Sequence, residues 1–362
     1  MIQTLKNLDL TIIVPVVLLI LFSVISIYSA TYGETDIYWK KQFIFGILSI
    51  FLILIFTFID YKKILNLAPY LYIIGILTLI YVKFFGITIL GAKRWINIGI
   101  GTIQPSEFMK FIIIITVAYM LHTVKLPITW KDVLKIIAVI AIPFILILKQ
   151  PDLGTALSIL FPIIFILFLA EIDKKYIIGS ILTILVASPF IYSSLEDYQK
   201  KRIKALFNPE ADPTGATYHL IQSKIAIGSG ELYGKGFLQG TQSKLLFLPE
   251  KHNDFIFASI SEEWGFIVSI TLVLIFFYLG VKILYWGERV KDKPAKFICY
   301  GVGGLISIQA FVNIAMTMGL APVVGITLPF LSYGGSSLLS FAIMIGLVSS
   351  IIREYKEQKL QF

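Results

Sequence analysis

The chain alternates between long apolar runs and short polar segments. The hydrocarbon core of a bilayer is about 30 Å thick, and roughly 20 apolar residues in a helix span it. Apolar runs of suitable length fall near residues 10–30, 42–60, 69–90, 106–123, 132–149, 155–171, 176–193, 255–286, 297–319 and 334–352. Backbone groups find no water partners in lipid, so each run is expected to be helical. The pattern predicts an all-α, polytopic integral membrane protein with about ten transmembrane helices.

The lysine and arginine residues between the runs indicate how the chain is oriented. If the N-terminus is cytoplasmic, the inner segments carry many more basic residues than the short outer loops, as cytoplasmic loops usually do. Both termini are then cytoplasmic, and the segment 194–253, between the seventh and eighth helices, is a long extracytoplasmic loop. We expect residues 1–362 to form a single transmembrane domain that contains this loop.

The long loop has three parts. Pro209, Pro213 and Gly215 interrupt any helix near its start. An apolar-periodic stretch, 218–225, follows and is suited to a helix lying on the membrane surface. The glycine-rich segment 228–242 is then either a flexible connector or a place where the backbone approaches a ligand closely.

Composition supports the membrane assignment and narrows the possible partners. The chain is 57% hydrophobic and 15% charged with a mean hydropathy of +0.86, whereas soluble domains are about half apolar and a quarter charged. The net charge of +9 comes mainly from loops, so the expected partner is anionic membrane lipid and not nucleic acid. The one cysteine, Cys299, lies in an apolar run, which excludes a disulfide framework. The first run is too long for a signal-peptide core and is expected to stay uncleaved.

The densest polar cluster lies where the eighth helix begins, in the segment 245–265 (LLFLPEKHNDFIFASISEEWG). Charge at a bilayer boundary is costly unless it is paired or used, so this cluster is a candidate functional site. Asp254 directly precedes the first expected residue of the helix. Its carboxylate either caps the helix or, held between the helix N-terminus, cations and Glu250, abstracts a proton. Glu262 and Glu263 are expected at or above the outer surface. The polar neighbours of Asp254 in this cluster are Glu250, His252, Glu262 and Glu263, with Asp152 expected nearby.

A second polar segment, 91–110, lies between the third and fourth helices on the same outer face. Pro105 and Ser106 mark a helix start. Glu107 and Lys110 are spaced i to i+3, so they can pair. They form either a structural ion pair, with Lys110 snorkelling outward, or a site in which the ammonium group faces a central cavity and holds a phosphate oxygen.

The remaining outer segments are a turn, 149–157, and an irregular segment, 319–337. In the turn, Asp152 is expected to cap the sixth helix. The irregular segment contains two prolines and paired glycines, which no continuous helix accommodates. Irregular backbone at membrane depth is tolerated where it lines a cavity. We therefore expect the four polar segments to meet at one face.

At these residues the chain resembles the shape, elongation, division and sporulation (SEDS) family of bacterial cell-wall proteins, typified by RodA and FtsW. The resemblance covers nearly the whole length and includes GAKRWINIG, QPSEFMK, QPDLGTA, FLPEKHNDFIFA, EEWG and NIAMTMGLAPVVGITLPFLSYGGSS. It implies a peptidoglycan glycosyltransferase that polymerises lipid II at the outer face of the bacterial cytoplasmic membrane. It also implies a class B penicillin-binding protein as transpeptidase partner. The compact termini favour a role in elongation over one in division.

The resemblance also implies roles for particular residues. Asp254 takes the place of the essential acid, and Lys110 that of a membrane-facing lysine. Asn253 replaces the usual threonine, and Thr102 stands where many members have arginine, so Arg94 and Lys93 are the candidates to supply the missing phosphate contact. The expected substrate-binding residues are Lys110, Arg94, Trp95, Glu107, Glu250, His252, Asp152, Ser332 and Ser336.

The implied reaction is attack of a sugar 4-hydroxyl on the anomeric carbon of a lipid-linked donor, which expels undecaprenyl diphosphate. The donor bond is α and the product bond β, so a single in-line displacement suffices. Asp254 is the candidate base, and Lys110 and Arg94 are candidates to stabilise the leaving group. No ligand set demands a metal cofactor, although a divalent cation, Mg²⁺ or Mn²⁺, sharing the diphosphate is an open alternative.

Two other classes of function stay open from the sequence. A transporter that flips lipid II would also have about ten spans and a polar interior, but its charges should run along the middle of several helices, and here they gather at the outer mouth. A structural scaffold for a partner synthase explains neither the cluster at the eighth helix nor the one before the fourth.

Overall fold

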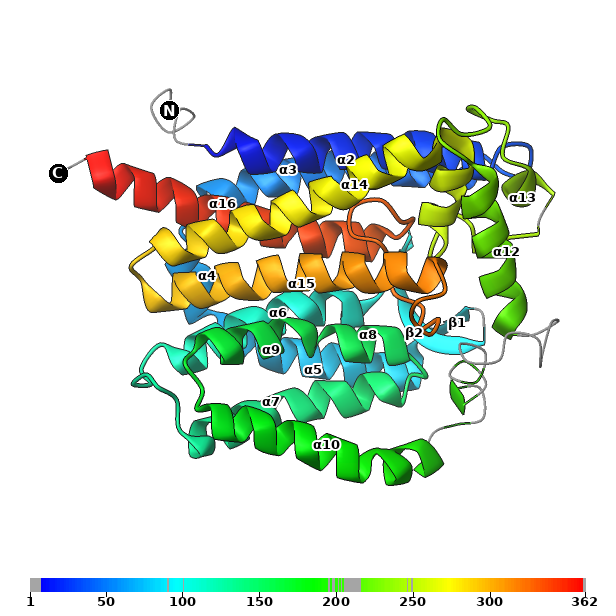
Figure 1. Cartoon of the computed structure of the whole chain (residues 1–362). Coiled ribbons are helices and arrows are strands. Elements are labelled where there is room, and N and C mark those ends of the chain that lie inside the picture. The colour runs from blue at the N-terminus through cyan, green and yellow to red at the C-terminus, as the bar shows by residue number, and fades with distance from the viewer. Residues whose placement is uncertain are drawn as a thin grey trace.

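The computed structural model describes residues 8–89, 91–99, 101–194, 196, 199–200, 202, 204, 216–245, 247–248 and 250–360. Long helices run side by side, and the first and last of them have the chain ends at the same end of the bundle (Figure 1). The helices of the bundle are α2 (Leu10–Ala30), α3 (Ile37–Phe58), α4 (Tyr61–Asn66), α5 (Ala68–Phe85), α6 (Pro105–Leu121), α7 (Trp130–Leu148), α8 (Leu153–Ser158), α9 (Phe161–Leu169), α10 (Lys174–Ser194), α14 (Ile256–Arg289), α15 (Lys293–Thr317) and α16 (Gly335–Leu360).

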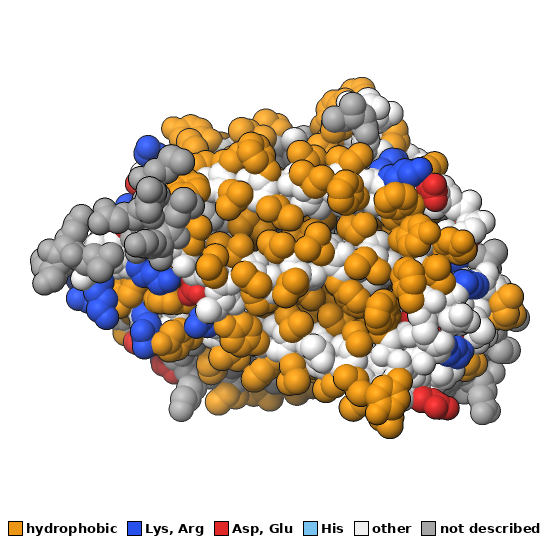
Figure 2. Space-filling model, turned by 90° about the horizontal axis from the view of Figure 1, so that it is seen from above, with side chains coloured by type: hydrophobic (Ala, Val, Ile, Leu, Met, Phe, Trp, Pro, Cys, Tyr) orange, Lys and Arg blue, Asp and Glu red, His pale blue; other side chains and the backbone are white. Residues whose placement is uncertain are grey.

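Each of the ten predicted apolar runs contains a helix, with the sixth run divided between α8 and α9. In the described part of the chain, six helices (α2, α3, α5, α14, α15 and α16) are long and apolar enough to cross a membrane on length and composition alone. On the face seen in Figure 2, hydrophobic side chains cover the middle of the molecule and charged side chains gather toward its two ends. The predicted all-α, polytopic membrane class is therefore confirmed. The single-domain assignment stays a prediction.

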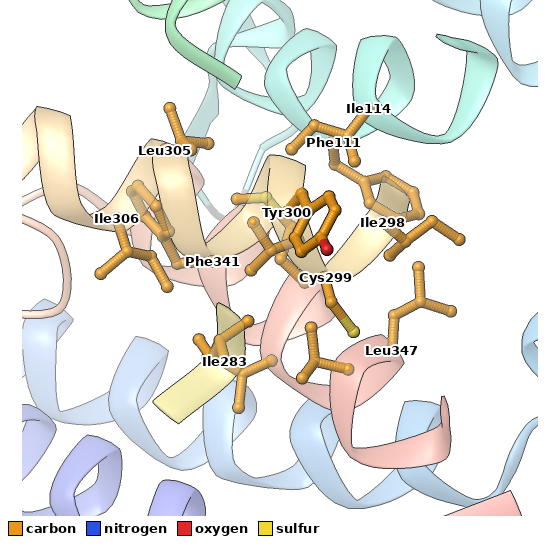
Figure 3. Packing of buried hydrophobic residues seen from close by; sticks show 14 of the residues in the cluster. Phe111, Ile114, Ile283, Ile298, Cys299, Tyr300, Leu305, Ile306, Phe341 and Leu347 are labelled. Atoms are coloured by element: carbon orange, nitrogen blue, oxygen red, sulfur yellow. The ribbon is translucent and has the colours of Figure 1, made fainter. Parts of the chain in front are cut away.

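The helices α15 and α16 form the centre of the bundle. In their most apolar windows, 72% and 83% of the residues are buried, against 22% in α5. Tyr300 and Cys299 of α15 pack among side chains from α6, α14 and α16, including Phe111 (Figure 3). Glycines permit this close approach, because a Cβ at Gly304 would lie 2.6 Å from the Phe165 ring. Lipid supplies no hydrophobic force between helices, so small residues and close packing hold them together.

A small antiparallel sheet links α5 to α6, and the hydrophobic pattern did not predict it. Its strands, in the order β1, β2, β3, are Ile87–Ile89, Ala92–Asn97 and Thr102–Ile103. The predicted apolar run ended at residue 90, but α5 ends at Phe85 and the apolar residues after it pair with β2. Hydropathy does not distinguish a short apolar strand from the last turn of a helix. The sheet lies at the end of the bundle opposite the chain termini (Figure 1).

The described part of the loop between α10 and α14 packs firmly on the bundle. Its helix α12 (Ala216–Ser229), where a surface helix was predicted, lies across the ends of the long helices, and a short helix, α13 (Thr241–Lys244), follows (Figure 1). A Cβ at Gly234 would overlap the backbone at Glu263. The glycine-rich segment is therefore a close-packed element and not a loose connector. The helix-breaking residues Pro209, Pro213 and Gly215 lie outside the described residues.

Glu262 and Glu263, expected at or above the outer surface of the membrane, are buried within the protein. Their exposed fractions are 0% and 4%, because the loop folds back over α14 and supplies donors to them. The Glu262 carboxylate accepts hydrogen bonds from the backbone N–H groups of Thr241 (2.8 Å) and Gln242 (3.0 Å) at the start of α13, and from Lys235 Nζ (2.7 Å). Glu263 accepts from Ser29 Oγ at 2.6 Å. Both carboxylates thus tie the loop and α2 to α14.

We predict that Gly265→Ala destabilises the protein strongly. Gly265 has φ +73° inside α14, and a Cβ there would overlap the backbone of Gly234 and Leu232. This backbone conformation (φ +73°, ψ −170°) is essentially restricted to glycine and costs another residue about 1–3 kcal/mol, and overpacking costs about 1–3 kcal/mol. The apparent unfolding temperature of the purified protein in detergent should fall. The matched control is Gly179→Ala in α10, where a Cβ meets no atom within 4 Å and helix propensity favours alanine by about 1 kcal/mol. Equal unfolding temperatures for the two variants would contradict this account of the kink.

Candidate functional site

The residues before α14 form a tight turn that presents Asp254. The backbone N–H groups of Asn253 and Phe255 donate to the Glu250 carbonyl at 2.9 and 3.3 Å, and Glu250 has φ +48°. The helix begins at Ile256 with Phe255 in the N-cap position, so Asp254 is not the cap that one interpretation of the sequence expected. No hydrogen bond from the described residues reaches its carboxylate.

Hydrogen bonds hold three consecutive carbonyls of this turn. The His252 carbonyl accepts from the Tyr333 N–H at 2.8 Å, and the Asn253 carbonyl accepts from Ser332 Oγ at 2.8 Å. The Asp254 carbonyl accepts from Asn313 Nδ2, on α15, at 2.9 Å. The main chain of Asp254 is therefore fixed by the 319–337 segment and α15, while its side chain is left without a donor among the described residues.

Two glycines bring further segments against Asp254. A Cβ at Gly325, which has φ +74°, would lie 3.4 Å from Asp254 Oδ2, so the carboxylate faces this glycine directly. A Cβ at Gly154, on α8, would lie 2.6 Å from the carbonyl oxygens of Val324 and Gly325. The start of α8, the irregular segment before α16 and the turn before α14 thus meet at one place, as the sequence predicted for the segments that contain them.

Asp152 caps α8, as predicted, and also binds groups from the neighbouring segment. Its Oδ1 accepts from the Thr155 N–H at 3.1 Å, and its Oδ2 accepts from Gln104 Nε2 at 2.9 Å. Arg94 Nη1 lies 3.7 Å from the same carboxylate. Arg94 Nε donates to the Gln150 carbonyl at 2.9 Å, and Nη2 donates to the Pro151 carbonyl. The guanidinium therefore clamps strand β2 to the turn before α8.

The surroundings raise the pKa of Asp254 to about 7. Burial is the largest cause, and the negative charges of Glu250 and Asp152 add to it, whereas Arg202 and Arg94 lower it. Asp254 itself is half-buried. At neutral pH both protonation states of this carboxyl group are populated, which is the condition that suits a general base.

His252 lies beside this turn as a packed aromatic ring. Its ring centroid is 4.2 Å from that of Tyr38 and 5.6 Å from that of Tyr333. Burial lowers the pKa of the imidazole below its usual value. The neutral ring thus anchors the turn against α3 and the segment before α16.

Lys110 and Glu107 form an ion pair that is sealed inside the bundle. Their exposed fractions are 1% and 5%, and Lys110 Nζ lies 2.8 Å from Glu107 Oε2. The ammonium group also donates to Gln309 Oε1 at 3.3 Å and lies 5.5 Å from the centroid of the Phe341 ring. Lys110 does not snorkel outward. The phosphate contact by Lys110 stays a prediction. The burial of Lys110 and its short contact with Glu107 are the features of a structural ion pair.

The remaining predicted residues lie around the same end of the bundle. Ser336 Oγ accepts from the Gln104 N–H at 2.9 Å and so joins α16 to the start of α6. Ser332 Oγ accepts from the Leu328 N–H at 2.7 Å in addition to holding the Asn253 carbonyl. Trp95 pairs with Ile87 in the sheet and is half-buried. All of these are placed by the structure, and their roles toward a substrate stay predictions.

Two buried amides were missed at the sequence level, Gln104 and Gln309. Gln309 has an exposed fraction of 0% and stands four residues before Asn313 in an apolar helix. A pair of polar side chains at i and i+4 inside a membrane helix is a signal that sequence alone contains. Among the described residues, no group of three or more His, Cys, Asp and Glu side chains is arranged to hold a metal ion.

Fold and site together define a class: a polytopic membrane protein with a polar site at one end of its helix bundle. A family model described as cell cycle protein, of the FtsW, RodA and SpoVE type, matches residues 4–357. The chain belongs to this family. It is 37% identical over 348 residues to the peptidoglycan glycosyltransferase MrdB of Escherichia coli (strain K12), a match that covers 95% of this chain and 93% of that protein.

Another relative and two solved structures are also similar to this chain over nearly its whole length. The probable peptidoglycan glycosyltransferase FtsW of Trichlorobacter lovleyi is 36% identical over 356 residues, with coverage of 95% and 92%. A chain from a peptidoglycan synthase complex that coordinates polymerization and crosslinking matches with a TM-score of 0.83 and 25% identity, covering 96% of this chain and 98% of that one. The Thermus thermophilus rod shape determining protein RodA matches in fold, with a TM-score of 0.71, 23% identity and coverage of 96% and 97%.

We predict that Lys110→Met costs about 3–5 kcal/mol of stability, because it leaves the Glu107 carboxylate buried without its counter-ion. The double variant Glu107→Gln/Lys110→Met should cost clearly less than the sum of the two single changes. Thermal or denaturant unfolding of the four proteins in detergent measures this coupling as a double-mutant cycle. Additivity within about 0.5 kcal/mol would show that the two side chains do not depend on each other.

Proposed function

We propose that this protein is a peptidoglycan glycosyltransferase that polymerises lipid II into glycan strands, with Asp254 as the general base. The observation that carries the proposal is the Asp254 carboxyl group, whose pKa is about 7. Hydrogen bonds hold the main chain of this residue, and its carboxyl group faces Gly325 where three segments meet. Names of relatives that match more than nine-tenths of the chain support the same activity.

The base takes one proton in this reaction. The 4-hydroxyl of the acceptor sugar attacks the anomeric carbon of the donor, its proton passes to the Asp254 carboxylate, and the bond to undecaprenyl diphosphate breaks. The displacement inverts the α bond to β, so no covalent enzyme intermediate is needed. A base held within hydrogen-bond reach of the hydroxyl contributes typically about 10²–10⁴-fold.

The departing diphosphate requires positive charge. Of the two predicted cations, Arg94 retains an exposed side-chain fraction of 27% and Lys110 only 2%. Arg94 is therefore the better candidate to meet a phosphate oxygen, which a guanidinium does well. No cofactor enters this scheme. Whether Mg²⁺ or Mn²⁺ shares the diphosphate is decided by assaying polymerisation with and without a chelator.

The proposal places both termini in the cytoplasm and the site at the outer face of the inner membrane. It is supported by the distribution of basic residues along the sequence. The site lies at the end of the bundle opposite the chain termini, which fits this orientation (Figure 1). Because lipid anchors hold both substrates in the membrane, their headgroups reach this end of the bundle by diffusion in two dimensions, and proximity lowers the barrier.

The proposed partner is a class B penicillin-binding protein that crosslinks the new strands. The similarity to a chain of a complex that coordinates polymerization and crosslinking supports it. The proposed role is elongation of the cell wall.

We predict that Asp254→Asn reduces polymerisation of purified lipid II by about 10²-fold or more, because it removes the base while keeping the size of the side chain. The protein should remain folded. The folded pKa of about 7 lies above the reference value of 3.8, so ionisation of Asp254 costs stability as pH rises between these values. The variant should therefore be at least as stable as the parent at pH above about 7.

The assay uses proteoliposomes with analysis of glycan products. The matched control is Asp173→Asn, an exposed carboxylate between α9 and α10. Retained polymerisation by Asp254→Asn would remove the base from the proposal. Inversion of lipid II across the membrane without glycan strands from the parent protein would favour a transporter in place of the enzyme.

We predict that polymerisation follows the ionisation of Asp254. The value of kcat/KM should fall about tenfold per pH unit below a pKa near 7 and reach a plateau above it. Glu250→Gln should move the profile to lower pH, because the negative charge of Glu250 raises the pKa of Asp254. Its Asn253 contact can persist, since glutamine offers an acceptor oxygen. A flat profile over roughly pH 5.5 to 8.5 in the parent would contradict the assignment.

A further inference from the structure

Two buried amides project from α15 toward the site. Gln309 and Asn313 are one helical turn apart, and the exposed fraction of each is 0%. An amide in an apolar environment is costly unless its hydrogen bonds are made, so such groups mark places where a helix must hold something.

Both amides hold the same short segment. Asn313 Nδ2 donates to the Ile326 carbonyl at 2.6 Å, and Gln309 Nε2 donates to the Thr327 carbonyl at 2.9 Å. The preceding residue, Gly325, is the one that faces the Asp254 carboxylate. Asn313 Nδ2 also donates to the Asp254 carbonyl. A single amide group thus joins the backbone of Asp254 to the segment that its carboxylate faces.

Lys110 controls the orientation of the second amide. Its ammonium group has only donors, so the Gln309 side chain must turn its oxygen toward Lys110 and its nitrogen toward Thr327. The other interactions of the ammonium group are with Glu107 and the Phe341 ring. A connected path of hydrogen bonds therefore runs from the ion pair inside the bundle to the segment 325–327.

We infer that Asn313 is a positioning residue for Asp254. Lys110 positions the same carboxylate indirectly, through Gln309 and the segment 325–327, and does not contact the substrate. The inference rests on the proposed role of Asp254 as base. It gives Lys110 a part in the reaction that its exposed fraction of 1% permits, whereas a direct phosphate contact requires an accessible ammonium group.

The test measures kcat, KM and the pH profile of lipid II polymerisation for Asn313→Ala, Gln309→Leu, Lys110→Gln and Lys110→Arg. A misplaced base slows the chemical step, so kcat should fall roughly 10–100-fold for the first three variants while KM changes less than about threefold. The apparent pKa of Asn313→Ala should also shift, because the carboxyl group moves relative to Glu250 and Arg94. Lys110→Arg keeps a charged donor and should restore much of kcat.

The matched control is Ser223→Ala. It removes another buried side-chain hydrogen bond to a backbone carbonyl, from the Ser223 hydroxyl group to the Thr317 carbonyl at 2.7 Å, one helical turn beyond Asn313 at the C-terminal end of α15. Its kcat should stay within about twofold of the parent. If Asn313→Ala does not fold, Asn313→Ser, which keeps a donor, is measured with the same readouts.

Three results would overturn the inference. One is a raised KM with unchanged kcat for Lys110→Gln, which would make Lys110 a substrate contact. Another is a normal kcat and pH profile for Asn313→Ala. The third is a low kcat with an unaltered pH profile for Asn313→Ala, which is what a loss of correctly folded protein produces. Failure of the base assignment itself is recognised separately, by retained polymerisation in Asp254→Asn.

Discussion

Hydrogen bonds to three successive carbonyls, those of His252, Asn253 and Asp254, are the constraint on which the candidate site depends. A membrane bundle cannot leave backbone groups unpaired at low cost, so the donors that satisfy this turn also fix its geometry. They come from residues more than 50 positions further along the chain, Asn313, Ser332 and Tyr333. The main chain that carries this one carboxylate is thus held by elements far from it in the sequence.

The other carboxylates at this end of the molecule show what is distinctive about Asp254. Asp152, Glu262 and Glu263 each accept hydrogen bonds from donors close by, and Glu107 has its lysine. Each of these groups has a structural task that explains its burial. Asp254 has no such donor among the described residues, and its pKa is raised. A carboxyl group whose charge the fold does not stabilise is free to accept a proton from something else.

Hydropathy and helix length were enough to predict the ten helical runs and the membrane class, because the bilayer imposes both. The cap at Asp152 was predictable as well, since its donor at Thr155 is only three residues away. Hydrogen-bond partners that lie far apart in the sequence could not be predicted. Nothing local indicates that the loop between α10 and α14 covers Glu262 and Glu263, or that Gln309 receives Lys110. The strand β1 was missed because its apolar residues continue the hydrophobic run of α5, whereas β2 and β3 are short strands inside the polar segment 91–110.

The resemblance to a known family named candidate site residues without showing how they are connected. It gave Lys110 as a membrane-facing lysine, and the sequence left open whether this lysine forms a structural ion pair or holds a phosphate oxygen. The structure pairs this lysine with Glu107, three residues before it, as the first alternative expected, and shows a further hydrogen bond from its ammonium group to Gln309. A buried ion pair is weak evidence for stability but is well suited to fixing one arrangement of its neighbours. In a bundle held together by small residues and a few polar contacts, such a pair can determine the geometry of a site that neither of its members touches.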